Sequence, residues 1–204
     1  MKELGFEQLK SKTRIFSYYQ IGTNNIIGIV YIDNTFFYGP DKVLLNEIKA
    51  KFMKKWEYRD LEELSEFLQM CIIYQDQKIF IDQTDYLKKI LQYFQMENAC
   101  PAPTPLLAEN YLQKHEGLVD SHLQKCFQTI IGSFLYLMLG TCPDIAFTII
   151  QLTRHTVNPS QDHLNKALYI YHYLARTQYY SIVYSGDSKL RIYAYTDSDW
   201  ASNP

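Results

Sequence analysis

The sequence predicts an α+β protein, in which strand-forming runs and helix-forming stretches occupy separate parts of the chain. Short apolar runs separated by turn residues fill the first forty positions, as in antiparallel hairpins. Apolar residues at helical spacing dominate from Leu123 to Ala175. Strand-like runs return at residues 182–184 and 190–196. These observations together indicate a mixed α+β architecture.

Composition sets the class of protein. The 204 residues are 47% hydrophobic, which is enough for a packed core. The formal net charge of −2 gives no overall attraction to nucleic acid, so any binding of a polyanion has to be local. Four widely spaced cysteines without a Cys-x-x-Cys pair favour reduced thiols over zinc or disulfides. No signal region and no membrane-length apolar run occurs, so we expect an intracellular protein, cytoplasmic or nuclear.

The first elements form a predicted hairpin followed by a helix. Strands are expected at residues 15–20, 26–32 and 35–38, which places Asp33 and Asn34 at a hairpin tip. Asp41 is the predicted N-cap of a helix that carries an apolar stripe. Three lysines crowd the last turn of this helix: Lys51, Lys54 and Lys55.

A second hairpin is expected at residues 67–74 and 78–81, and Thr84 opens the next helix. Three prolines between residues 100 and 106 then predict an extended connector, which is the best internal boundary of the chain. Beyond it lie three predicted helices, the second with Thr141 as N-cap and Pro143 as first residue. The third starts at Ser160, where His163 is interpreted as structural.

Asp33 and Asp197 are the candidate metal-binding residues. Taken alone, each is most simply a turn or a solvated strand end. A divalent-metal hydrolase site needs several converging carboxylates, yet few positions follow Asp197. The sequence is therefore interpreted as a fragment that holds two incomplete sites.

The order of elements around Tyr31-Ile32-Asp33-Asn34 resembles the Tyr-x-Asp-Asp hairpin of reverse transcriptases. The resemblance is closer to the Pol polyprotein of copia-type long-terminal-repeat retrotransposons. Further motifs of that family are matched in order: Leu4-Gly5-Phe6 before the hairpin, DLEEL at 60–64 with FLQ at 67–69 ("DLGEL…FLG"), residues 96–106 ("M.NAKP..TPL"), residues 131–136 with 143–146 ("VGSLMY…RPDIA"), residues 158–177 ("NP…H…RYLKGT") and residues 195–201 ("YSDADWA").

The resemblance implies three parts of such a polyprotein. Residues 1–106 would be a partial reverse transcriptase, the end of the palm and a thumb-like segment. Residues 107–180 would be a helical connection region, and residues 181–204 the truncated first strands of a ribonuclease H-like domain. The implied function is RNA-directed DNA synthesis, with a fragment that is inactive alone. The alternative is a catalytically inert nucleic-acid-binding or interaction remnant.

The resemblance also implies roles for individual residues. Asp33 and Asp197 would be catalytic carboxylates that bind Mg²⁺. Asn34 stands where the family has a second Asp, and a further catalytic Asp of the family belongs upstream of Met1. The three lysines would contact the phosphate backbone of an RNA/DNA template-primer, or else form a solvated helix face. Glu62 and Gln69 stand where the family has glycine, and a positive φ at these positions would cost them conformational free energy that glycine does not lose.

Overall fold

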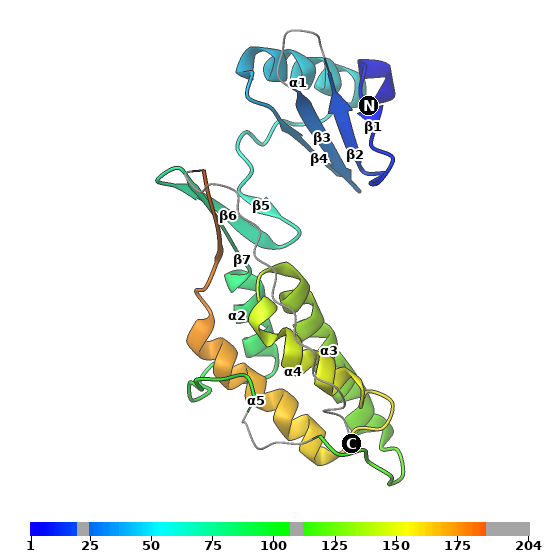
Figure 1. The fold of residues 1–204 in the computed structure, drawn as a ribbon, viewed down its shortest axis with the longest axis vertical. Helices are drawn as coiled ribbons and strands as arrows, with labels where there is room; N and C mark the ends of the chain where they lie inside the picture. Colours follow the sequence, from blue (N-terminus) through cyan, green and yellow to red (C-terminus); the bar gives the residue numbers. More distant parts are fainter. Residues whose placement is uncertain (20–24, 107–111, 187–204) are drawn as a thin grey trace, which may run out of the picture. The chain divides into compact units, whose positions relative to one another are not determined.

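The computed structural model describes residues 1–19, 25–106 and 112–186, and it confirms a mixed α+β chain (Figure 1). Two compact units are present, Met1–Leu64 (unit 1) and Ser65–Pro204 (unit 2). Each unit has its own antiparallel four-stranded sheet. The expected strand at residues 190–196 and Asp197 lie outside the described residues.

Unit 1 is a meander of strands followed by one helix. Its elements are the 3₁₀ helix η1 (Lys2–Leu4), β1 (Glu7–Gln8), β2 (Ile15–Tyr18), β3 (Ile26–Tyr31), β4 (Asn34–Tyr38) and α1 (Lys42–Trp56). Consecutive strands pair in the order β1-β2-β3-β4. Asp41 caps α1 as predicted, because its carboxylate accepts the backbone N–H groups of Val43 and Leu44 at 3.0 and 3.1 Å.

The core of unit 1 lies between the sheet and α1. Phe6, Ile26 and Ile48 are buried together there. In β3, buried Ile26 and Gly28 alternate with the exposed Ile27, which is the period of a sheet covered on one face. This face is the one that α1 covers.

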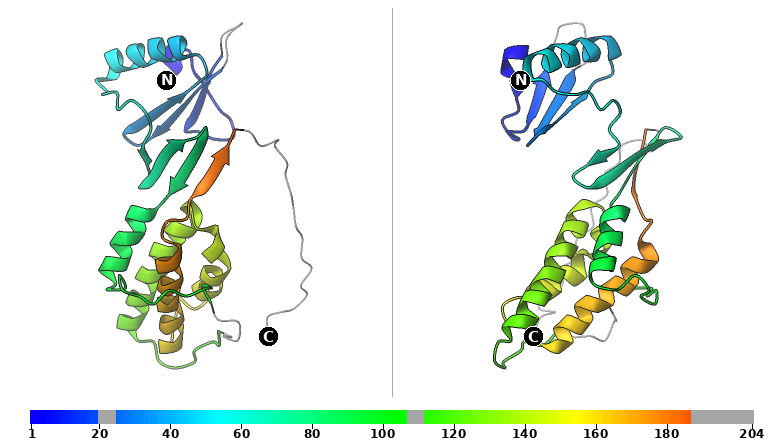
Figure 2. Two further views of the ribbon diagram at one scale, coloured as in Figure 1. Left: turned by 90° about the vertical axis from the view of Figure 1, so that its left-hand side faces the viewer. Right: turned by 180° about the vertical axis from the view of Figure 1, so that it is seen from behind.

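Unit 2 begins with three strands, continues as helices and ends with a strand. Its elements are β5 (Glu66–Phe67), β6 (Met70–Gln75), β7 (Lys78–Asp82), α2 (Thr84–Tyr93), α3 (Ser121–Gly140), the 3₁₀ helix η2 (Pro143–Ile145), α4 (Ala146–Thr153), α5 (Gln161–Thr177) and β8 (Ile182–Ser185). The helices pack beside one another at one end of the sheet (Figure 2). Fifteen buried residues from α2, α3, η2, α4 and α5 make the core. None of the described helices is long and apolar enough to cross a membrane.

One strand prediction needs correction. The run at residues 67–74 is not one strand, because a tight turn at Leu68 and Gln69 divides it into β5 and β6. The predicted strand at 182–184 is β8, and it pairs with β7, with Ile79 opposite Tyr184. The assignment of residues 181–204 to a ribonuclease H-like domain stays a prediction.

The proline connector does not separate the compact units. Ala102 is buried and donates its N–H to the carbonyl of His172 on α5 at 3.0 Å, while Nδ1 of His172 lies 2.8 Å from the carbonyl of Cys100. Proline forbids helical or central-strand hydrogen bonding, but an extended chain can still pack against a helix. The units divide instead at Leu64, and the functional division at residue 106 stays a prediction.

A buried amide ties the start of α2 to the end of α3. Oε1 of Gln83 accepts hydrogen bonds from the N–H and the hydroxyl of Thr141, at 2.9 and 3.0 Å. Thr141 therefore does not act as the predicted N-cap, and Cys142 takes that position before Pro143. Tyr173 on α5 donates to Asp144 at 2.5 Å, which fixes η2 against α5.

His163 has the structural role that the sequence indicates. Its Nδ1 accepts the N–H of Ser160 at 2.9 Å, and its own N–H donates to the Ser160 hydroxyl, so the two residues form a capping box. The imidazole is 1% exposed and stacks on His155 at 4.0 Å. Burial, and then the charge of His155, lower the pKa of His163 below its ordinary 6.5.

Replacing Gly140 by alanine tests the Gln83 network. A Cβ at position 140 would overlap the Gln83 amide, so we expect Gly140→Ala to lower the free energy of unfolding by roughly 1–3 kcal/mol. Gly132→Ala in the same helix meets no atom within 4 Å and should raise it by roughly 0.5–1 kcal/mol. Urea denaturation of both variants measures the difference, and equal effects would contradict the account of this contact.

The stability of unit 2 should depend on pH through His163. Because the pKa of His163 is lower in the folded state, the unfolded state binds a proton more readily than the folded state does. The free energy of unfolding is therefore at its full value above about pH 6.5 and decreases as the pH drops below it. His163→Gln should flatten this fall, whereas His122→Gln on the exposed part of α3 should leave it unchanged. Thermal unfolding between pH 5 and 8 decides, and an unaltered slope for His163→Gln would refute this origin.

Candidate functional site

The turn that presents Asp33 is tighter than the sequence predicts. Tyr31 and Asn34 pair across β3 and β4, so Ile32 and Asp33 form a two-residue turn and Asn34 is the first residue of β4. The predicted tip of Asp33 and Asn34 is therefore wrong by one residue. Ile32 has φ of +50° and is 74% exposed. A left-handed backbone costs a β-branched residue about 1–2 kcal/mol, so this turn stores strain.

Asp33 is exposed at this turn, and the described residues do not give it a metal site. Within residues 1–19, 25–106 and 112–186, no three His, Cys, Asp or Glu side chains are grouped so that they could hold an ion. Asn34 beside it offers an amide without charge. Paired divalent ions need several anionic oxygen ligands, so these residues do not fit such a group by themselves.

Three cations that the sequence did not single out lie on the β1–β2 loop, at the end of the sheet that carries the Asp33 turn. They are Lys10, Lys12 and Arg14 of the β1–β2 loop, and all three are exposed. The carbonyl of Arg14 accepts the N–H of Val30 at 2.9 Å, and the Arg14 guanidinium lies 5.0 Å from the centre of the Tyr31 ring. Tyr31 immediately precedes the turn, and the strand registers put the β1–β2 loop and the β3–β4 turn at one end of the sheet (Figure 1).

The predicted lysines lie elsewhere in unit 1. Lys51, Lys54 and Lys55 are exposed on α1, where Lys55 pairs with Glu3 and lies 4.9 Å from the Trp56 ring. The helix packs through Ile48 near Ile26, which begins β3, and through Phe52 against Phe37 at 5.2 Å. The Asp33 turn follows the opposite end of β3. The structure therefore does not bring the α1 lysines and Asp33 into one site.

The two residues that the resemblance places at glycine positions of the family adopt the backbone conformation that glycine favours. Glu62 has φ of +65° and Gln69 has φ of +56°, as the resemblance implied. The N–H of Glu62 donates to the Asp60 carboxylate at 2.9 Å, and Asp60 pairs with Lys49. That lysine lowers the pKa of Asp60. At the other site, the Tyr136 hydroxyl donates to the carbonyl of Leu68 and holds the strained β5–β6 turn against α3.

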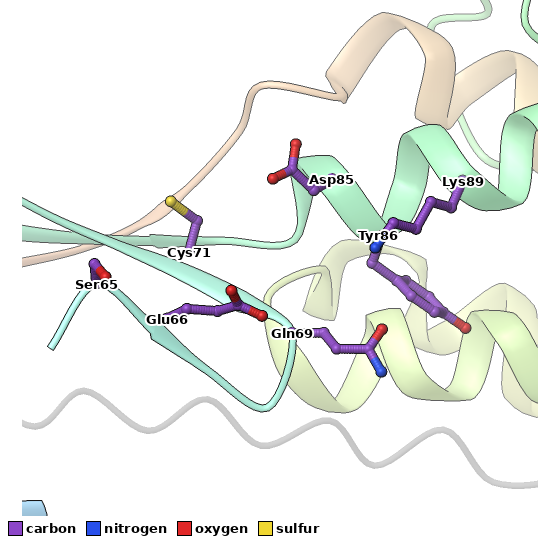
Figure 3. A pocket seen from close by; sticks show the side chains of 7 residues that line it. All are labelled: Ser65, Glu66, Gln69, Cys71, Asp85, Tyr86 and Lys89. Carbon is purple, nitrogen blue, oxygen red and sulfur yellow. The ribbon is translucent and has the colours of Figure 1, made fainter. Parts of the chain in front are cut away.

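A small polar pocket of about 190 Å³ lies between the β5–β6 hairpin and α2 (Figure 3). Its lining residues are Ser65, Glu66, Gln69, Cys71, Asp85, Tyr86 and Lys89. Burial, and then the negative charges of Asp82, Asp85 and Glu66, raise the pKa of the Cys71 thiol, so it is no activated nucleophile. The volume is also below the range of about 300–1,000 Å³ that ligand pockets occupy.

The chain matches a known family over its first half. The family model for reverse transcriptase (RNA-dependent DNA polymerase) matches residues 1–108. The Pol polyprotein of transposon TNT 1-94 from Nicotiana tabacum is 29% identical over 187 residues, 88% of this chain and 14% of that protein. The Pol polyprotein of transposon RE2 from Arabidopsis thaliana is 28% identical over 200 residues, 98% of this chain and 14% of that protein.

A shorter relative is also similar along most of its length. The uncharacterised mitochondrial protein AtMg00810 of Arabidopsis thaliana is 26% identical over 173 residues, which is 85% of this chain and 71% of that protein. No solved structure matches the chain. The chain thus spans about one seventh of the length of the Pol polyproteins that it resembles. Because the family model covers more than half of its residues, the chain belongs to the reverse transcriptase family, in the form found in the Pol polyproteins of copia-type retrotransposons.

Proposed function

We propose that the chain serves RNA-directed DNA synthesis as part of a retrotransposon reverse transcriptase and is catalytically inert by itself. Unit 1 would present Asp33 as one carboxylate of a Mg²⁺ site and bind the RNA/DNA template-primer. The observation that carries the proposal is the exposed Asp33 on a strained two-residue turn, inside the region that matches the family. Strain held at an exposed acidic turn is typical of functional sites.

The inertness follows from the charge available at the turn. Mg²⁺ demands several oxygen ligands, and a two-ion site needs enough negative charge to offset both ions. Asn34 contributes none, and the described residues bring no metal-binding group to the turn. Asp197 stays proposed as a metal-binding carboxylate of a ribonuclease H-like part, and it lies outside the described residues.

The three lysines of α1 stay proposed as phosphate contacts. Lys51 and Lys54 form no ion pair with a described residue, whereas Lys55 is already paired with Glu3. Two free cations and one engaged cation would give weak binding that fades as salt rises, because counterion release drives it.

A second function is favoured by Asn34. A chain that lost the second carboxylate of its turn but kept exposed cations would be a nucleic-acid-binding or interaction remnant. The two functions differ in one respect. Only a chain that takes part in synthesis would raise the activity of a reverse transcriptase that supplies the remaining carboxylates.

The purified chain should not extend a primer on an RNA template in the presence of Mg²⁺. Asn34→Asp should not restore extension, because one added carboxylate still leaves the ions short of ligands. Incorporation of labelled nucleotide measures this, with Asp33→Asn as the matched control. Extension by the unmodified chain that disappears in Asp33→Asn would contradict the proposed inertness, and extension that persists in Asp33→Asn would identify a contaminating polymerase.

A further inference from the structure

The β1–β2 loop concentrates positive charge at the end of the sheet that carries Asp33. Lys10, Lys12 and Arg14 alternate along the loop, and the sequence has no Asp or Glu between Glu7 and Asp33. All three side chains are exposed, and none forms an ion pair with any residue of the described ranges. The first acidic residue before the loop is Glu7 in β1, and the first one after it is Asp33. The loop is therefore a local cationic surface on a slightly acidic protein.

Hydrogen bonds hold this loop in one shape. The Leu9 N–H donates to the Ile15 carbonyl at 2.9 Å, and the Ile15 N–H donates to the Lys12 carbonyl at 3.1 Å. The Gln8 side chain donates to the Thr13 carbonyl at 2.5 Å. A loop already ordered in this way loses little conformational entropy when it binds a ligand.

Arg14 is oriented by its aromatic neighbour. Its guanidinium lies over the Tyr31 ring, in a cation–π contact that leaves the planar fork with donors for a further partner. Such a fork matches the geometry of a phosphate diester, which it can bind through two hydrogen bonds. The same contact places the fork next to the residue that precedes the Asp33 turn.

We propose that Lys10, Lys12 and Arg14 bind the phosphate backbone of the nucleic-acid strand that reaches the Asp33 turn. This inference rests on the proposed function, because it takes nucleic acid as the ligand, and it adds the residues that would hold the strand. The loop binds through charge and is indifferent to base sequence. It, more than the lysines of α1, positions a strand beside Asp33, since α1 packs near the other end of β3.

The test is the binding of a labelled RNA–DNA hybrid by the whole chain at several salt concentrations without Mg²⁺. The loop variant carries Lys10→Gln, Lys12→Gln and Arg14→Gln. The control variant carries Lys78→Gln, Lys125→Gln and Arg154→Gln, three exposed cations of unit 2, so that both variants lose the same charge. A third variant neutralises Lys51, Lys54 and Lys55. Thermal unfolding confirms that each variant is folded.

We expect the loop variant to bind the hybrid at least roughly tenfold more weakly than the unmodified chain. The slope of log affinity against log salt concentration should become less steep, by an amount that corresponds to the loss of up to about three phosphate contacts. The control variant should bind like the unmodified chain. Asp33→Asn should bind more tightly, because it removes a negative charge beside the strand. Equal binding by the loop and control variants, or a loss confined to the α1 variant, would overturn the inference while leaving nucleic-acid binding intact. No binding by the unmodified chain at low salt would overturn the proposed function together with it.

Discussion

The register of β2, β3 and β4 is the constraint on which the candidate site depends. Pairing of Tyr31 with Asn34 leaves only two residues for the turn, so Asp33 has to project from the end of the sheet. The same register sets Arg14 beside Val30 and thereby brings the β1–β2 loop to that end. A slip of one residue would turn Ile26 from the core to the open face. Burial of Ile26 against Phe6 and Ile48 therefore fixes the position of the acidic turn.

Positive φ occurs at several non-glycine residues of the described chain, at the turns that resemble family motifs and also at Glu57, Asp76, Gln77 and Gln95. Ile32, Glu62 and Gln69 all have positive φ, a conformation that costs non-glycine residues free energy. Neighbouring contacts compensate in two of these cases, through the Asp60 carboxylate at Glu62 and the Tyr136 hydroxyl beside Gln69. The positive φ of residues 62 and 69 is thus supported by contacts with neighbouring side chains.

Local physics made much of this fold predictable. Asp41 and Ser160 cap helices because their side chains accept hydrogen bonds from the free N–H groups of the first turn. This interaction involves only residues close together in the sequence, so the sequence alone can predict it. The turn at Ile32 was missed because β-branched residues rarely tolerate positive φ. The pairing of β8 with β7 was missed because periodicity identifies a strand without naming its partner. The basic loop was missed for the same reason, since its nearness to Asp33 exists only once the register is known.

The central claim is that the β1–β2 loop and the Asp33 turn share one end of the sheet, away from the lysines of α1. All four cysteines lie in unit 2, so they can be replaced by alanine and a nitroxide attached at Asp33→Cys without touching another residue of unit 1. Paramagnetic broadening of backbone amides then reports proximity to the label. The account predicts stronger broadening at residues 12–14 than at residues 51–55, relative to a diamagnetic label. Equal broadening of the two segments, or stronger broadening on α1, would contradict it.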